Sequence, residues 1–410
     1  DKKFKRFRKP SLSDQISYIM NKKATPCILF YFSREKVENN ARYAANLNFK
    51  IKKNVQLRHL FEDIFDDITN EEYQLLNLDE LYWMWSRGVA YHHAGLAPIV
   101  KEFVEFLFIN RHIDILFATE TLSLGINMPA KSIIIDSSFK YDGLKTRLIS
   151  KSEFLQLTGR AGRRGIDSKG YAYINYDKRV ENSWYNDLFD LKPNNLKSSY
   201  SNSYGSVLNL NNKYGEKKGI EMIKKSFYSY QNKLNDKALE TNYKAKLKVL
   251  NEMNYFTDLK KNKLLTETHR DNLILGIEML NENNDIEFCL MFLASGISTS
   301  KYEISVHDKY NDLLTKYLIS QEKVNKLEAF SGVKNKINLD ITWFSIFLEF
   351  YNSDNIEYTL SKFNVTLGDF IKACREASEI SQKVYSIYEI ENFDKIAKKL
   401  KHNIIQKTMI

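Results

Sequence analysis

The sequence predicts an α/β lobe followed by a helical C-terminal half, and two patterns carry this prediction. Between about residues 10 and 180, short apolar runs alternate with helical stretches, the pattern of a parallel sheet with helices on both faces. Further on, Leu367, Phe370, Ile371, Cys374 and Ala377 recur at helical spacing, which favours a helix with one buried face. At 410 residues the chain is too long for one ordinary core, so two or three domains are expected.

The strands of the lobe are predicted from short apolar runs. Such a run, bounded by polar or turn residues, is typical of a buried parallel strand. The acidic and then aromatic stretch 55–87 between two of the runs is interpreted as helical packing within the lobe. The strand candidates are Ile28–Phe32, Ala90–His92, Ile113–Ala118, Ser132–Ile135 and Tyr171–Ile174.

Composition indicates a globular protein, and its basic net charge is compatible with an anionic partner. The hydrophobic fraction is 43%, the charged fraction is 27% and the net charge is +10. The net charge alone does not distinguish an anionic partner from a lysine-rich surface that keeps the protein soluble. No stretch approaches the roughly 20 apolar residues that span a bilayer, and the polar, basic start does not resemble a signal peptide. We therefore expect a cytoplasmic protein without a membrane partner.

The cysteines and the paired histidines do not predict a metal site. Cys27, Cys289 and Cys374 are widely spaced and lie in apolar stretches, so we interpret them as buried free thiols in a reducing compartment. Neighbouring residues of an extended segment point to opposite faces. His92 and His93 are therefore expected to have structural or interdomain roles rather than to bind one zinc ion together.

A glycine- and arginine-rich segment at 156–165 is the most informative part of the chain. It reads Gln-Leu-Thr-Gly-Arg-Ala-Gly-Arg-Arg-Gly. Its glycines let the backbone turn tightly and approach a ligand, and its arginines carry planar donor forks that suit phosphate oxygens. Such cations can stabilise the charge that develops on a transferring phosphoryl group. The glycines are Gly159, Gly162 and Gly165, and the arginines are Arg160, Arg163 and Arg164.

A second segment places polar groups at the end of a predicted strand. Thr119, Glu120 and Thr121 follow the apolar run that ends at Ala118, and Pro129 closes the loop that comes next. Ligands of open α/β sheets collect beyond the carboxyl ends of the strands. Glu120 is expected to pair with one of the arginines rather than to act as a catalytic base.

Four segments, in this order, resemble motifs of superfamily 2 helicases. Pro26–Arg34 is similar to motif IV, and Gly88–Pro98 contains a His-His-x-Gly-Leu signature. Ile113–Ala130, with Gly-Ile-Asn-Met-Pro-Ala at its end, resembles motif V, and 156–165 resembles motif VI. The sequences of the last two segments resemble those of the superkiller-type (Ski) DExH-box branch, which includes exosome-associated RNA helicases.

The resemblance implies a role for several residues at the nucleotide. In this family ATP binds between two RecA-like lobes, and the chain would supply the second lobe. Arg160 and Arg163 would then be arginine fingers that face the γ-phosphate. Gln156 would couple the nucleotide to the bound strand. The other residues that match nucleotide-side positions are Gly125, Asn127 and Gly159.

The resemblance also implies contacts with the backbone of a nucleic acid. Ser33 and Arg34 match contacts of motif IV, and Thr119 matches a contact of motif V. Lys372 and Arg375 lie off the apolar stripe of the last helical region and are nominated as further contacts; an ordinary solvated face is the alternative. Contacts to phosphate and sugar would make binding largely independent of sequence.

The same resemblance predicts three domains. Residues 1–180 would be the second RecA-like lobe, 181–270 a winged-helix domain, and 271–410 a helical bundle of the type called DSHCT. A hairpin-like stretch at Tyr255–Thr266 stands where a wing is expected. Gln231 leads almost directly to Lys244–Leu250, so the long arch-like insertion of several relatives does not fit here.

Two motifs of a complete helicase motor do not occur in the sequence. There is neither a G-x-x-x-x-G-K-[ST] phosphate loop nor a DExH box. In the family these two motifs belong to the first lobe, which makes most of the contacts with ATP and Mg. We therefore expect the chain to be the C-terminal portion of a larger helicase and to be inactive by itself. The alternative is a half-helicase that acts as a binding module or regulator.

These observations predict part of an ATP-dependent RNA helicase that moves 3′ to 5′ in RNA decay or processing. Single-stranded or 3′-tailed RNA and the first RecA-like lobe are the expected partners; an exonuclease or adaptor partner is left open. The alternatives are a DNA helicase of the same branch and a non-enzymatic module that binds nucleic acid or protein.

Overall fold

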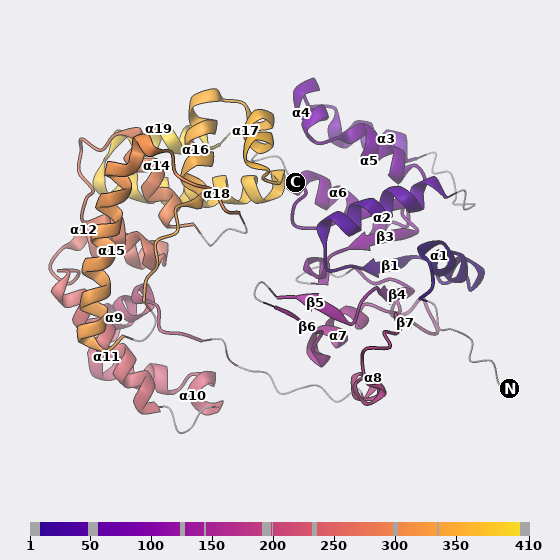
Figure 1. The fold of residues 1–410 in the computed structure, drawn as a ribbon, viewed down its shortest axis with the longest axis horizontal. Helices are drawn as coiled ribbons and strands as arrows, with labels where there is room; N and C mark the ends of the chain where they lie inside the picture. Colours follow the sequence, from indigo (N-terminus) through magenta and orange to yellow (C-terminus); the bar gives the residue numbers. More distant parts are fainter. Residues whose placement is uncertain are drawn as a thin grey trace. The chain divides into compact units, whose positions relative to one another are not determined.

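The computed structural model describes residues 9–47, 56–123, 128–142, 145–190, 198, 200–231, 236–297, 302–333 and 336–401. The chain divides into two compact units between Asn195 and Leu196 (Figure 1). This boundary lies later in the chain than residue 180, where the predicted lobe ends. Each unit is described by itself.

The described part of the first unit contains a five-stranded parallel sheet in the order β2-β3-β1-β4-β7. The strands are β1 (Cys27–Phe30), β2 (Val89–His92), β3 (Ile115–Ala118), β4 (Ser132–Ile135) and β7 (Tyr171–Ile174). The sequence predicted each of them, the last two with their observed bounds. Every residue of β1 to β4 is buried because helices cover the sheet, and all of them except His92 and Ser132 carry largely apolar side chains.

The sheet register brings the carboxyl ends of the strands to one edge. Ala118 pairs with Phe30 and with His92, and Ile135 pairs with Phe30 and with Ile174. The residues that follow these five strands therefore lie along the same edge, where ligands of α/β sheets bind.

The helices of the first unit begin at residues that satisfy their free N–H groups. Ser11, Thr69 and Ser150 each form a capping box with the acidic residue three positions later. The helices are α1 (Leu12–Asn21), α2 (Arg34–Asn46), α3 (Leu57–Phe65), α4 (Asn70–Leu75), α5 (Leu78–Trp85), α6 (Pro98–Ile109), α7 (Lys151–Thr158), α8 (Asn182–Phe189) and the 3-10 turn η1 (Glu120–Ser123). A two-stranded antiparallel ribbon, β5 (Phe139–Tyr141) and β6 (Thr146–Leu148), was not predicted.

The stretch 55–87 packs as the sequence predicted over its described part. The Trp85 ring is fully buried and lies 5.1 Å from that of Phe103 on α6 and 6.3 Å from that of Phe65 on α3. Tyr82 packs against Phe61 at 4.8 Å. Trp85 thus belongs to the core between these helices, and Tyr82 packs at its half-buried margin.

The second unit is helical throughout its described residues. Its elements are α9 (Tyr204–Lys224), α10 (Phe227–Gln231), α11 (Asp236–Glu252), α12 (Leu259–Thr268), η2 (Asp271–Leu273), α13 (Ile274–Ile277), α14 (Ile286–Ser295), η3 (Asp308–Tyr310), α15 (Asn311–Ser331), α16 (Thr342–Ser353), α17 (Ile356–Phe363), α18 (Leu367–Tyr388) and α19 (Glu391–Lys399). The hairpin predicted at Tyr255–Thr266 is wrong, because α12 occupies most of that stretch. Asp258 caps this helix by accepting a hydrogen bond from the Lys261 amide.

Burial along α18 follows the predicted stripe. Phe370, Ile371, Cys374 and Ala377 are buried, whereas Lys372 is exposed. The three cysteines are free and buried, as predicted. Within the described residues, no helix is both long and apolar enough to span a membrane.

Candidate functional site

Three predicted contact residues lie at the carboxyl edge of the sheet. Ser33 and Arg34 follow β1, and Thr119 follows β3. The Thr119 amide donates to the carbonyl of His92 at 3.2 Å, which ties the end of β3 to that of β2. The Thr119 hydroxyl lies 2.8 Å from that of Thr121, and the residue is 9% exposed. The structure thus brings the three residues predicted to contact nucleic acid to one edge of the sheet, with the Thr119 side chain largely buried.

Gly95 leaves room for the Arg34 side chain. A Cβ at Gly95 would lie 3.1 Å from Arg34 Nη1 and 3.0 Å from His93 Nδ1. Ser33 caps α2 by accepting a hydrogen bond from the Lys36 amide at 3.4 Å. The glycine of the His-His-x-Gly-Leu signature therefore has a physical reason, since a Cβ at 95 would crowd the Arg34 guanidinium and the His93 ring.

The two histidines have structural partners on different helices. His93 Nδ1 accepts a hydrogen bond from the Gly95 amide at 3.1 Å, so Nε2 carries the proton and donates to Glu38 on α2 at 3.0 Å. Burial and, to a smaller degree, the Arg34 charge lower the pKa of His93, which keeps the ring neutral. His92 Nε2 lies 2.8 Å from Glu105 on α6. No group of three metal-ligating side chains occurs among the described residues.

The segment 159–165, hereafter the arginine loop, follows directly after α7. Gly162 and Gly165 have φ of 90° and 77°, which favour glycine. Gly159 instead adopts a right-handed helical conformation, with φ of −60°, as the C-cap of α7. A Cβ at Gly159 would lie 2.9 Å from the carbonyl oxygen of Leu155, so close backbone approach favours glycine there too.

A parallel backbone bridge joins the arginine loop to the end of the motif V segment. The Ala130 amide donates to the carbonyl of Arg160 at 2.9 Å, and the Gly162 amide donates to the carbonyl of Ala130 at 2.7 Å. Because Ala130 leads directly into β4, these two bonds fix the backbone of the loop to the sheet.

Gly170 holds the loop from its other side. A Cβ at Gly170 would lie 2.5 Å from the backbone of Ala161 and Gly162. No side chain larger than hydrogen fits at that distance, so this glycine is required by close backbone approach rather than by its φ.

The two predicted arginine fingers have different environments. Arg163 forms a bidentate ion pair with Asp167, in which Nε lies 2.6 Å from Oδ2 and Nη2 lies 2.7 Å from Oδ1. This pair raises the pKa of Arg163 and lowers that of Asp167. Arg160 is half-buried, which lowers its pKa, and Arg164 is exposed. Gln156 is exposed on α7, one helical turn before Arg160.

An ion cluster fixes α7, which carries the arginine loop. Lys140 Nζ on β5 lies 2.6 Å from Glu120 and 2.8 Å from Glu153. Arg147 on β6 binds both carboxylate oxygens of Glu153, at 2.8 and 2.9 Å. The structure pairs Glu120 with Lys140, and the expected pair with an arginine of motif VI stays a prediction. The cluster connects the 3-10 turn after β3 to the N-terminus of α7.

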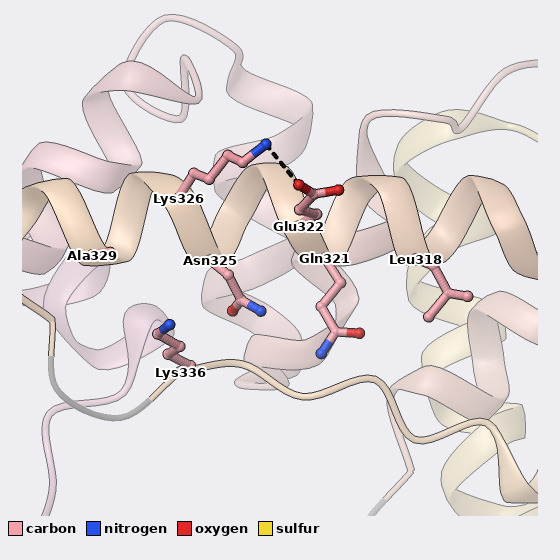
Figure 2. A pocket seen from close by; sticks show the side chains of 7 residues that line it. All are labelled: Leu318, Gln321, Glu322, Asn325, Lys326, Ala329 and Lys336. Atoms are coloured by element: carbon pink, nitrogen blue, oxygen red, sulfur yellow. Dashed lines mark ion pairs between the residues drawn. The ribbon is translucent and has the colours of Figure 1, made fainter.

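Two other predicted site residues lie in the second unit. Lys372 is exposed on α18 and its Nζ lies 3.8 Å from Glu376; Arg375 is half-buried. A groove of about 390 Å³ runs along α15 (Figure 2), and none of the predicted site residues lines it. The groove is lined by Leu318, Gln321, Glu322, Asn325, Lys326, Ala329 and Lys336. Gly125 and Asn127 lie outside the described residues.

Comparison with known proteins finds a helicase domain and similar helicases. Residues 64–165 match the helicase conserved C-terminal domain. The chain is 35% identical to an uncharacterized helicase of Schizosaccharomyces pombe over 223 residues, 34% identical to human exosome RNA helicase MTR4 over 217 residues, and 33% identical to antiviral helicase SKI2 of Saccharomyces cerevisiae over 239 residues. These alignments cover 54%, 53% and 58% of the chain but 22%, 21% and 18% of the respective relatives.

These matches support a C-terminal portion of a superkiller-type helicase of superfamily 2. The chain spans about a fifth of the length of the curated relatives it matches. The matched region includes the His-His-x-Gly-Leu signature and motifs V and VI. Its parallel sheet with covering helices is that of a RecA-like lobe.

Sequence reasoning missed the residues that hold the helicase motifs in place. A Ser-x-x-Glu pattern at Ser150 and Glu153 signals a helix start, but nothing local connects Glu153 to Lys140. Asp167, four residues after Arg163, was a detectable ion-pair candidate. No local sequence pattern marks Gly170, because the backbone that crowds it belongs to Ala161 and Gly162, which come earlier in the chain.

Acidification should weaken the ion cluster around Glu153. Hydrogen bonds from Arg147, Lys140 and Ser150 hold the pKa of Glu153 far below its ordinary value. The folded chain therefore binds fewer protons than the unfolded chain near about pH 4. This contribution to stability is present above the ordinary carboxyl pKa and is lost as the pH falls.

We therefore expect Glu153→Gln to lower the free energy of unfolding by about 1–3 kcal/mol at neutral pH. The difference from wild type should shrink toward about pH 3. Urea denaturation followed by tryptophan fluorescence measures it, since Trp83, Trp85 and Trp184 report on the first unit. A difference that stays constant with pH would contradict the assigned cluster.

Gly170→Ala should disturb the arginine loop through direct overlap with its backbone. The methyl group would force Ala161 and Gly162 to move, and we expect a loss of about 1–3 kcal/mol in the free energy of unfolding. Gly165→Ala is the matched control, because a Cβ there meets no atom within 4 Å and costs only left-handed strain. If Gly170→Ala is as stable as wild type, the loop is not packed as described.

Proposed function

We propose that the chain forms the second lobe and the following domains of an ATP-dependent RNA helicase. In this proposal its arginine loop completes an ATP site whose phosphate loop and DExH box belong to a first RecA-like lobe, in the same polypeptide or in a partner. The observation that carries the proposal is the backbone bridge between Ala130 and the arginine loop. It ties the backbone on both sides of Ala161, between Arg160 and Arg163, to the segment that leads into β4.

Cations on a fixed backbone suit phosphoryl transfer. A positioned guanidinium stabilises the charge on the γ-phosphate in the transition state without reorganising at that moment. Arginine fingers contribute about 10³- to 10⁵-fold to turnover in NTPases. ATP and Mg would be bound mainly by the first lobe, whereas this chain would supply Arg160 and Arg163 as fingers and Gln156 as the link to the nucleic acid.

In this proposal the nucleic acid contacts the carboxyl edge of the sheet. Ser33, Arg34 and Thr119 offer hydroxyl and guanidinium groups there, and Lys372 and Arg375 of α18 would add cationic contacts. Such groups recognise phosphate and sugar rather than bases. The net charge of +10 supports an anionic partner. Opening and closing of the ATP cleft would then move the lobes along one strand, 3′ to 5′.

The relatives favour RNA over DNA as the substrate, because several of them are named RNA helicases. We further propose the subdivision of the C-terminal region into a winged-helix domain at 181–270 and a helical DSHCT-like bundle at 271–410. A cytoplasmic role in RNA decay or processing, with an exonuclease or adaptor as partner, belongs to the same proposal.

The test is ATP turnover by the polypeptide that unites this chain with a first lobe. Turnover is measured without nucleic acid, with single-stranded RNA, and with DNA of the same sequence. Stimulation by RNA and not by DNA is the expected result. Equal stimulation by DNA would indicate a DNA helicase of this branch, and no turnover under any condition would indicate a non-enzymatic binding module.

Arg163→Ala should reduce RNA-stimulated turnover at least about 1,000-fold while RNA affinity stays close to that of wild type. The reason is that the lost cation acts on the γ-phosphate and not on the strand. Arg179→Ala removes an exposed arginine of the same unit and is the matched control. Normal turnover of Arg163→Ala would refute the assignment of Arg163 as a finger.

A further inference from the structure

The ion pair between Arg163 and Asp167 leaves one side of the guanidinium available. Asp167 binds the edge formed by Nε and Nη2. These two bonds leave Nη1, with its two N–H groups, at the opposite end of the planar fork. Arg163 can therefore donate from Nη1 to a phosphate oxygen while Nε and Nη2 stay bound to Asp167.

Asp167 is committed to this one arginine. Its Oδ2 also accepts a hydrogen bond from the Arg163 backbone amide at 3.1 Å. The guanidinium and the backbone amide of Arg163 therefore bind the same carboxylate. The side chain of Asp167 is 5% exposed and that of Arg163 is 13% exposed. A pair this well covered is screened little by solvent and keeps one geometry.

The backbone around the pair is closed as well. The amides of Ile166 and Asp167 donate to the carbonyl of Arg163 at 3.0 and 2.9 Å, which forms a compact turn with Gly165 at positive φ. The turn follows Gly162, which the Ala130 bridge and Gly170 hold on two sides. The main chain and the guanidinium of Arg163 are thus fixed by separate contacts.

We propose that Asp167 is the positioning residue of the arginine finger Arg163: it orients the guanidinium so that Nη1 faces the γ-phosphate of ATP. This inference rests on the proposed function. The opposite hypothesis is that Asp167 stores Arg163 in an inactive pose and must release it for turnover. Positioning fits the structure better, because a storing carboxylate would be expected to occupy the phosphate-binding end of the fork.

The test is steady-state ATP turnover, with saturating RNA, by the polypeptide that unites this chain with a first lobe. We expect Asp167→Asn to lower kcat about 10- to 100-fold, the loss typical when the partner that orients a functional side chain is removed. The KM for ATP and the RNA affinity should change little, because Arg163 acts on the transition state. Asp167→Glu, which retains the charge, should recover part of kcat.

A double-mutant comparison separates positioning from a general structural role. If Asp167 acts only through Arg163, adding Asp167→Asn to Arg163→Ala causes no further loss of kcat. Asp177→Asn is the matched control, because it removes the carboxylate of an exposed aspartate–arginine pair in the same unit and should leave kcat unchanged.

Three results would overturn the inference. A kcat of Asp167→Asn equal to or above that of wild type would refute positioning, and a higher value would indicate storage. A further loss in the Arg163→Ala background would indicate a structural role. Absence of turnover in the wild type would overturn the inference together with the proposed function; the first two results leave that function intact.

Discussion

The site of this helicase lobe depends on two backbone hydrogen bonds between residues 130 and 160–162. They join the end of one helicase motif to the middle of the next and anchor both to β4. Backbone bonds of this kind do not depend on side-chain rotamers, so the arginines start from a fixed main chain. Every assigned role of Arg160 and Arg163 presupposes this connection.

Ion pairs hold both ends of the segment that runs from α7 through the arginine loop. Lys140, Arg147, Glu120 and Glu153 neutralise one another at the start of α7, and Arg163 is held by Asp167 at its end. Cations near a phosphate need rigid support, because a mobile arginine loses side-chain entropy when it binds. Glu120, Glu153 and Asp167 therefore support the cations that they bind.

The sequence predicted the sheet because its strands are short, apolar and buried; β4 and β7 were predicted with their observed bounds. It also predicted the polar edge, since carboxyl ends of parallel strands coincide. It failed where distant backbone decides the structure, as at Gly170, and where one cation joins three elements, as at Lys140. The stretch at Tyr255–Thr266 was misread because its lysines and asparagine indicate a turn locally, whereas Asp258 starts a helix there.

The most direct test of the account is hydrogen exchange at the Gly162 amide of the chain without nucleotide. This amide donates to the Ala130 carbonyl at 2.7 Å. If the arginine loop is fixed before ATP binds, the amide should exchange at least about 100-fold more slowly than in an unfolded chain. Exchange at the unprotected rate would show that the bridge does not persist in solution and would contradict a preorganised arginine loop.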